Sequence, residues 1–286
     1  MYANIYNSED CSGDVIENSK NCKNSFDIKN CEDSKNISFT PKTNNTYDCD
    51  FASPYGIESS LELCSSAGAS YSLSTFICWN SSSCFYSIEC HNSSNLFGCV
   101  GLKHKEYCIL NKQYTKEEYE ILVPKIIEHM RKTEEWGEFL PISLSPFAYN
   151  ETVAQEYFPL AKEEALAKGY KWKDEDESSQ YQGPTYEVPE NITNVKNNIC
   201  DAILKCEITG KLYKIIPQEL TFYREMNLPI PKRCPDQRHK DRMALRNHRK
   251  LFDRNCMKCN ALIKTTYAPD RPEIVYCEKC YLESVY

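Results

Sequence analysis

Four cysteines close to the C-terminal end have the spacing of a metal site. They follow the pattern Cys256-x2-Cys259-x17-Cys277-x2-Cys280, which lies within the range of four-cysteine zinc sites. Each Cys-x-x-Cys turn directs two thiolates at one ion, and two such turns complete a tetrahedron. No coordination position is left for a substrate. The spacing therefore predicts one structural Zn²⁺, with an iron–sulfur centre or disulfides as the chemical alternatives.

An upstream pair of turns has only half of such a ligand set. Cys206-Glu-Ile-Thr209 and Cys234-Pro-Asp-Gln237 carry Thr and Gln where the second cysteine of each turn would stand. Two cysteines alone do not hold zinc tightly. Either other side chains complete a second site, or the fold persists with packing in place of the metal. The candidate second metal set is Cys200, Cys206, Cys234 and His239.

A basic segment, residues 238–250, lies between the two pairs of turns. Its arginines recur at i, i+4, i+8 and i+11, so a helix over this segment would carry them on one face. Such a face can bind the phosphates of RNA or DNA, or it can pair with acidic groups of the protein itself. The candidate nucleic-acid-binding residues are Arg238, Lys240, Arg242, Arg246, Arg249 and Lys250.

The charge distribution favours the same region for a polyanion. Residues 232–286 hold 13 Lys/Arg against 7 Asp/Glu, a balance of +6, so with a net charge of −7 the remainder carries −13. A partner such as RNA or DNA would meet the C-terminal part.

Catalysis has weaker support in the sequence. His239, Asn247 and His248, followed by Cys256 and Cys259, give a faint likeness to metal-dependent nucleases of the HNH group. That chemistry needs its histidine in a ββα arrangement, whereas His248 falls at the end of the expected helix. The leading hypothesis is a non-enzymatic binding or scaffold protein, with an HNH-like nuclease or a self-assembling structural protein as alternatives.

Several distinctive strings carry a likeness to known sequences: Asn95-Leu96-Phe97-Gly98-Cys99-Val100-Gly101-Leu102, Cys206-Glu-Ile-Thr-Gly210, Cys234-Pro-Asp-Gln-Arg-His239, Arg242-Met-Ala-Leu-Arg246 and Thr266-Tyr-Ala-Pro-Asp-Arg-Pro-Glu273. In these strings the chain resembles a family of uncharacterised bacterial zinc-ribbon proteins known mainly from metagenomic sequences. The resemblance implies a zinc site and a Cys/Asn-rich front half, and it implies no particular activity. Family members with complete ligand sets carry cysteine at the places of Thr209 and Gln237.

Residues 1–112 precede these sites as a region rich in Cys, Asn and Ser. Its cysteines recur at steps of nine and eighteen, as from Cys22 to Cys31 and from Cys31 to Cys49. Short alternating segments at a near-constant period predict a parallel β-helix-like solenoid with about 18 residues per coil. Asn at the bends tolerates left-handed backbone and can form hydrogen-bonded ladders. An irregular Cys/Ser-rich β domain is the alternative, and the solenoid face is a possible surface for a protein partner.

The regions after the solenoid are expected to hold and position the metal part. Residues 113–170 form a helical connector, with a capping box at Thr115 to Glu118, a kink or break at Pro124 and a second helix over 161–168. Residues 171–199 form an acidic linker, and residues 200–286 a tandem zinc-ribbon-like domain with the basic helix. The predicted fold class is thus mixed β and α.

The cysteines also bear on the cellular compartment. Seventeen is an odd number, ten lying between Cys11 and Cys108 and seven between Cys200 and Cys280. The first ten residues are polar, unlike a secretory signal, and no run approaches the ~18 apolar residues of a membrane span. We therefore expect reduced thiols in the cytoplasm and no membrane partner.

Overall fold

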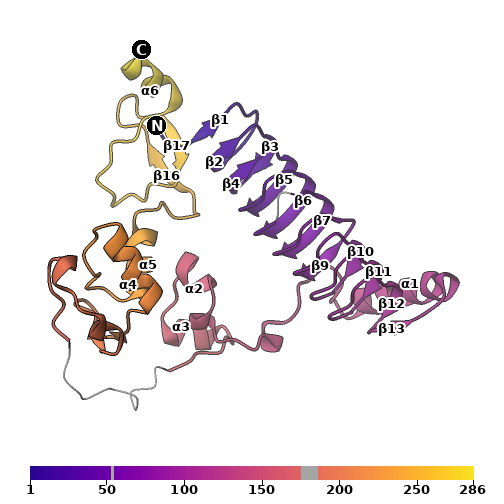
Figure 1. The fold of residues 1–286 in the computed structure, drawn as a ribbon. Coiled ribbons are helices and arrows are strands. Elements are labelled where there is room, and N and C mark those ends of the chain that lie inside the picture. Colours follow the sequence, from indigo (N-terminus) through magenta and orange to yellow (C-terminus); the bar gives the residue numbers. More distant parts are fainter. Residues whose placement is uncertain (53–54, 175–185) are drawn as a thin grey trace. The chain divides into compact units, whose positions relative to one another are not determined.

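The computed structural model describes residues 1–52, 55–174 and 186–286. These residues form two compact units (Figure 1). Unit 1 comprises Met1–Pro146 and His248–Tyr286, and unit 2 comprises Phe147–Asn247. The segment 200–286, which the sequence analysis treats as one domain, is therefore divided between the two units at residue 248.

A parallel β-solenoid makes up most of unit 1, as predicted. Its strands form one 13-stranded sheet in which all pairs are parallel except the last, which is antiparallel. The strands are β1 (Ile5–Tyr6), β2 (Gly13–Glu17), β3 (Lys20–Lys23), β4 (Ser25–Lys29), β5 (Glu32–Ser38), β6 (Thr43–Asp50), β7 (Ile57–Cys64), β8 (Ala69–Ser70), β9 (Leu73–Phe76), β10 (Ser82–Phe85), β11 (Ser94–Phe97), β12 (Glu106–Ile109) and β13 (Lys112–Gln113).

The coil is shorter than predicted. Ser82 pairs with Ser94 and Ser94 with Glu106, so the usual coil has 12 residues and the expected length of about 18 is wrong. Side chains face the interior at every third residue, as the burial of Cys22, Ser25, Ile28 and Cys31 shows. Each coil thus has four three-residue sides. A step of nine spans three sides and a step of eighteen spans six, so neither equals one coil.

The backbone of this solenoid explains its composition. Every third residue over long stretches has a positive φ, for example 51° at Asn21, 50° at Asn24 and 54° at Asp27. Asn and Asp adopt this left-handed conformation more readily than other non-glycine residues. Their side chains also form the expected ladders, since Asn24 Nδ2 donates to Asn36 Oδ1 at 2.9 Å.

The solenoid interior is narrow and is filled by small side chains. Ser66 Oγ accepts a hydrogen bond from the amide of Cys78, one coil later, and Ser72 Oγ does the same for Cys84, both at 3.3 Å. Burial raises the pKa of the Cys22 thiol to about 12 and that of Cys84 to about 12. These thiols stay neutral and act as small core residues.

Helix α1 (Lys116–Lys132) covers the last coils of the solenoid. The predicted capping box at its start is present, since the Glu118 amide donates to Thr115 Oγ1 at 3.2 Å and the Thr115 amide to Glu118 Oε2 at 2.9 Å. Pro124 lies inside the helix without splitting it. Tyr119 and Val123 of α1 pack in one cluster with Phe97 and Ile109 of the solenoid.

Unit 2 is mainly helical and has its own apolar core. Residues 192–199, assigned from the sequence to an acidic linker, contribute Ile192, Val195 and Ile199 to this core. The part of that linker at 175–185 lies outside the described residues. The elements of the unit are η2 (Tyr149–Glu151), α2 (Ala154–Tyr157), α3 (Lys162–Ala167), η4 (Ile192–Asn194), η5 (Asn197–Cys200), β14 (Leu204–Lys205), β15 (Leu212–Tyr213), α4 (Pro217–Glu225) and α5 (Pro235–Ala244).

The remaining elements belong to unit 1. The short 3₁₀ helix η1 (Ile142–Leu144) follows α1, and the C-terminal segment forms β16 (Phe252–Asn255), β17 (Leu262–Thr265) and α6 (Glu278–Val285). In the described residues, none of the helices combines the length and apolar character that a membrane span requires.

Candidate metal centre

The first two cysteines of the predicted zinc site lie in the turn between β16 and β17. This turn is closed by two backbone hydrogen bonds, from the amide of Cys256 to the carbonyl of Ala261 and from the amide of Asn260 to the carbonyl of Cys256, both 2.8 Å. Asn260 takes the left-handed conformation with φ of 62°, which Asn tolerates better than most residues. The tight turn aims the side chains of Cys256 and Cys259 to the same side.

The other two cysteines come from the start of helix α6. Cys277 is the N-cap residue of this helix, and Cys280 lies in its first turn. The segment before the helix is held against the turn because the amide of Met257 donates to the carbonyl of Val275 at 3.0 Å. Val275 is only 1% exposed. Two local structures, a β turn and a helix N-terminus, thereby meet at one point.

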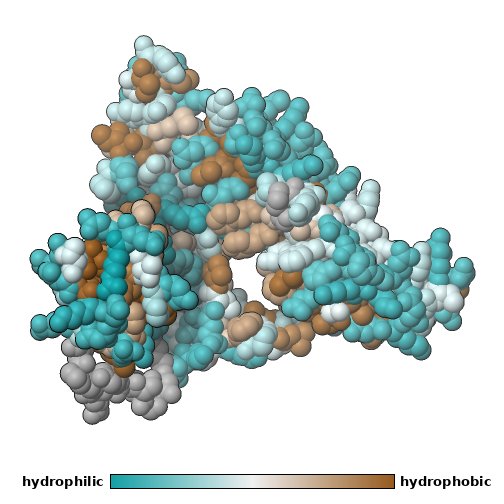
Figure 2. Space-filling view, in the orientation of Figure 1, coloured by the Kyte–Doolittle hydropathy of each residue, from teal (hydrophilic) through white to brown (hydrophobic). Residues whose placement is uncertain are grey.

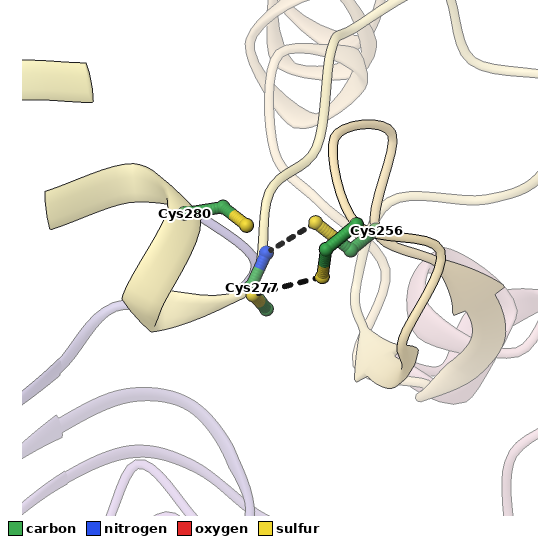
Figure 3. Close-up of side chains that lie close together, drawn as sticks. Cys256, Cys277 and Cys280 are labelled. Carbon is green, nitrogen blue, oxygen red and sulfur yellow. Dashed lines mark hydrogen bonds between the residues drawn. The ribbon is translucent and has the colours of Figure 1, made fainter. Parts of the chain in front are cut away.

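The four sulfur atoms form a compact group. All lie within 4.8 Å of one another, and Cys259 Sγ is 3.7 Å from Cys277 Sγ. Four thiolates at the usual Zn–S distance around a tetrahedral ion would be about 3.8 Å apart. In Figure 3 the side chains of Cys256, Cys277 and Cys280 point toward one another from the turn and from the start of α6.

The electrostatics around the sulfurs favour one thiolate in particular. Burial acts to raise the pKa of Cys256, but backbone N–H groups of Cys259, Cys277 and Lys258 outweigh it and lower the pKa to about 6. One of these donors, the amide of Cys277, is 3.3 Å from Cys256 Sγ. The pKa of Cys280, by contrast, is raised to about 12 by burial and by the other three thiols. Four neighbouring thiolates repel one another, and a divalent cation between them would offset this repulsion and keep all four sulfurs deprotonated.

The arrangement can bind a metal ion but leaves no coordination position for a substrate. Cys256 and Cys280 are buried, Cys277 is half-buried and Cys259 is exposed. Because four sulfurs fill a tetrahedron, the chemistry of the donor set is that of a closed structural site. Within the described residues this is the one group of three or more Cys, His, Asp or Glu side chains with such convergence.

The candidate second metal set, Cys200, Cys206, Cys234 and His239, is not brought together in this way. Cys206 and Cys234 are buried in the core of unit 2, and Cys200 packs against its edge. His239 Nε2 instead lies 2.9 Å from Glu156 Oε1. Gln237, at the place of a missing cysteine, donates from Nε2 to Asp241 Oδ1 at 2.7 Å. Cys206 and Cys234 therefore lie among apolar side chains and not in a set of three or more converging metal ligands.

The basic segment does not form the single arginine-lined helix that the sequence predicted. Helix α5 ends at Ala244, so Arg246 and Arg249 lie beyond it. Arg238 donates to Tyr223 Oη at 3.1 Å and approaches Glu219 Oε1 at 3.4 Å. Arg246 donates to Tyr157 Oη at 3.3 Å.

Arg249 has the most completely structural role of the six basic residues. Its side chain is only 8% exposed, and its guanidinium donates to Asp27 Oδ2 of the solenoid at 3.1 Å. The same group lies 3.8 Å from the centre of the Phe39 ring. Lys240, Arg242 and Lys250 are exposed.

Two threonines beside the metal site were missed by the sequence analysis. Thr265 and Thr266, at the end of β17, are 0% and 2% exposed and bond to the first coils of the solenoid. Their partners lie more than 250 residues earlier in the chain. No local pattern could therefore have found them.

Comparison with protein-family models, with curated proteins and with solved structures gives no match for this chain.

Proposed function

We propose that this protein is a non-enzymatic binding or scaffold protein whose C-terminal cysteines hold one structural Zn²⁺. The observation that carries the proposal is the convergence of four sulfurs within 4.8 Å. Thiolate sets of this kind select zinc or iron–sulfur centres over hard cations, and a site with four protein ligands has no open position for catalysis. The resemblance to bacterial zinc-ribbon proteins supports the same metal, and the free cysteines support a cytoplasmic location.

The surface offered to a protein partner is the outer face of the solenoid. This face is mainly hydrophilic in the view of Figure 2. On successive coils, however, Phe76, Ile88 and Val100 form a bridged ladder, and Trp79 lies one side away. Phe76, Trp79 and Val100 are 37%, 50% and 52% exposed. A regular row of apolar side chains on a rigid sheet suits a protein partner better than a small substrate.

Association with RNA or DNA is the weaker candidate. Arg238, Arg246 and Arg249 have hydrogen-bond or ion-pair partners within the protein. Lys250 lies over the ring of Phe252, 5.4 Å from its centre. Lys240 and Arg242 are exposed members of the set that would bind phosphates. A nuclease of the HNH type has less support still, because His248 lies in the irregular segment between α5 and β16 rather than in a ββα arrangement.

The proposal is tested by measuring metal content in the purified full-length protein. We expect one zinc per chain, and none in Cys280→Ser, because three thiolates cannot close the tetrahedron. The matched control is Cys206→Ser, which removes a buried cysteine of the upstream turn and should retain one zinc. Iron in place of zinc, or a metal-free wild-type protein, would contradict the proposal. Two zinc ions per chain would show that the candidate second metal set also binds an ion.

A further inference from the structure

The hairpin that carries the metal site is bonded directly to the first coils of the solenoid. Thr265 Oγ1 donates to the carbonyl of Tyr2, and Thr266 Oγ1 donates to Asp14 Oδ2, both at 2.6 Å. Thr265 is the last residue of β17, which begins just after the turn of Cys256 and Cys259, and Thr266 follows it directly. The metal hairpin and the start of the solenoid therefore share buried hydrogen bonds.

Asp14 accepts most of the hydrogen bonds at this contact between the hairpin and the solenoid. This residue is 5% exposed, and a carboxylate is costly to bury unless hydrogen bonds compensate it. Oδ1 accepts bonds from the Asn4 amide at 2.7 Å, from Asn4 Nδ2 at 3.1 Å and from the Val15 amide at 3.0 Å. Oδ2 accepts the bond from Thr266. The carboxylate thus links two successive coils to the metal hairpin.

The segment leading into the hairpin contacts three further coils. Arg249 pairs with Asp27 and stacks on Phe39, and its guanidinium lies 5.8 Å from the Phe51 ring centre. Together with the threonine contacts, these interactions connect residues 248–266 to the first five coils. The C-terminal segment thereby braces the N-terminal end of the solenoid.

The hairpin itself has little apolar stabilisation of its own. Ile263 and Val275 are buried, whereas Leu262 and Ile274 are 73% and 65% exposed. Small units with so little core generally fold only with a metal or another covalent or ionic link. The position of Thr265 and Thr266 therefore depends on an intact turn at Cys256, and that turn depends on the ion.

We propose that the metal site acts as a clamp on the solenoid, so that metal occupancy decides whether the first coils are closed or open. The clamp comprises the four cysteines, Thr265, Thr266 and Asp14. It rests on the proposed function, in that an ion must occupy the four-cysteine site. Loss of the ion loosens the hairpin, frees Asp14 from its Thr266 partner and lets the strand β1 separate from β2.

The test is hydrogen exchange on the full-length protein, with zinc and after removal of zinc by a chelator. Amides of residues 4–18 should exchange at least about tenfold faster without zinc. Local opening there would no longer require breaking the hydrogen bonds from Thr265 and Thr266. Amides of β11 and β12, at the other end of the solenoid, should keep their rates. An equal acceleration at both ends would mean global unfolding and would overturn the clamp.

A variant separates the clamp from metal binding itself. Thr266→Val should retain one zinc per chain, yet exchange at residues 4–18 should be fast whether zinc is present or not. Thr266→Ser keeps the hydroxyl and should preserve the dependence on zinc. If the wild-type protein binds zinc but exchange at residues 4–18 is the same without it, the clamp fails and the proposed function stands. If it binds no metal, the proposed function fails first.

Discussion

Two modules of this chain have closely similar backbones and different means of stabilisation. In the downstream module (residues 252–280), the Cys256 and Asn260 amides close the turn with bonds of 2.8 Å. In the upstream module (residues 204–237), the amide of Cys206 bonds to the carbonyl of Lys211 and the amide of Gly210 to the carbonyl of Cys206, both at 2.9 Å. Gly210 has a φ of 71°, matching the left-handed Asn260.

The similarity extends to the second half of each module. Cys277 is the N-cap of α6, and Cys234 is the N-cap of α5. Burial acts to raise the pKa of Cys206, but the hydroxyl of Thr209 and the backbone amides of Cys234, Thr209 and Ile208 lower it to about 6. The upstream module therefore still provides the hydrogen-bond donors that stabilise a thiolate at Cys206.

The two modules differ in the side chains that surround these cysteines. The upstream module belongs to a cluster of eleven buried residues, including Leu204, Ile215 and Leu220. The downstream module has four converging sulfurs and few buried apolar side chains. The comparison teaches that one backbone arrangement can be stabilised either by a metal or by an apolar core.

The sharpest test of this comparison is to rebuild the missing ligands. The double variant Thr209→Cys, Gln237→Cys should raise the zinc content from one to two per chain, because the turn and the helix N-terminus already have the required backbone. The control Thr209→Ser, Gln237→Ser should stay at one. Metal analysis of the purified proteins decides the matter, and one zinc in the double-cysteine variant would show that the two backbones differ at the ligand positions.

A smaller effect is expected from the apolar core. Ile215 is 0% exposed, so Ile215→Ala should lower the free energy of unfolding by about 2–5 kcal/mol. The control Ile208→Ala, at a side chain 57% exposed, should change it by less than about 0.5 kcal/mol. Denaturant unfolding with and without a chelator measures both. If the loss in Ile215→Ala appeared only in the presence of zinc, the upstream module would not be stabilised independently of the metal.

The smallest expected effect is the change in zinc affinity for each unit of pH. Metal binding requires all four sulfurs as thiolates, so it releases the protons that the thiols carry without metal. The stability that metal binding contributes is therefore present at high pH and lost as pH falls. Cys280, with a pKa of about 12 without metal, must release its proton at any ordinary pH. Zinc affinity should therefore fall at least about tenfold per pH unit from 8 to 5.

The fall in affinity should steepen below about pH 6, where Cys256 also becomes protonated. Competition with a chromophoric chelator at each pH measures the affinity directly. An affinity that does not change with pH would indicate ligands other than these thiols.

The four-cysteine site, the solenoid class and the capping box at Thr115 could be predicted because each depends on residues close in sequence. The left-handed backbone conformation of Asn21 and Asn24 is likewise favoured by the type of side chain at each position. The coil length could not be predicted from the cysteine spacing, because cysteine occupies any of the inward-facing positions and its recurrence does not identify a single side.

What the sequence by itself determined is therefore the local chemistry: which residues can turn left-handed, which turns present thiols in pairs, and where a helix begins. Tertiary structure alone decided that Arg249 is buried against Asp27 and that Thr266 bonds to Asp14. Bonds between groups more than 200 residues apart form only when the whole chain has packed, and no periodicity in the sequence encodes them.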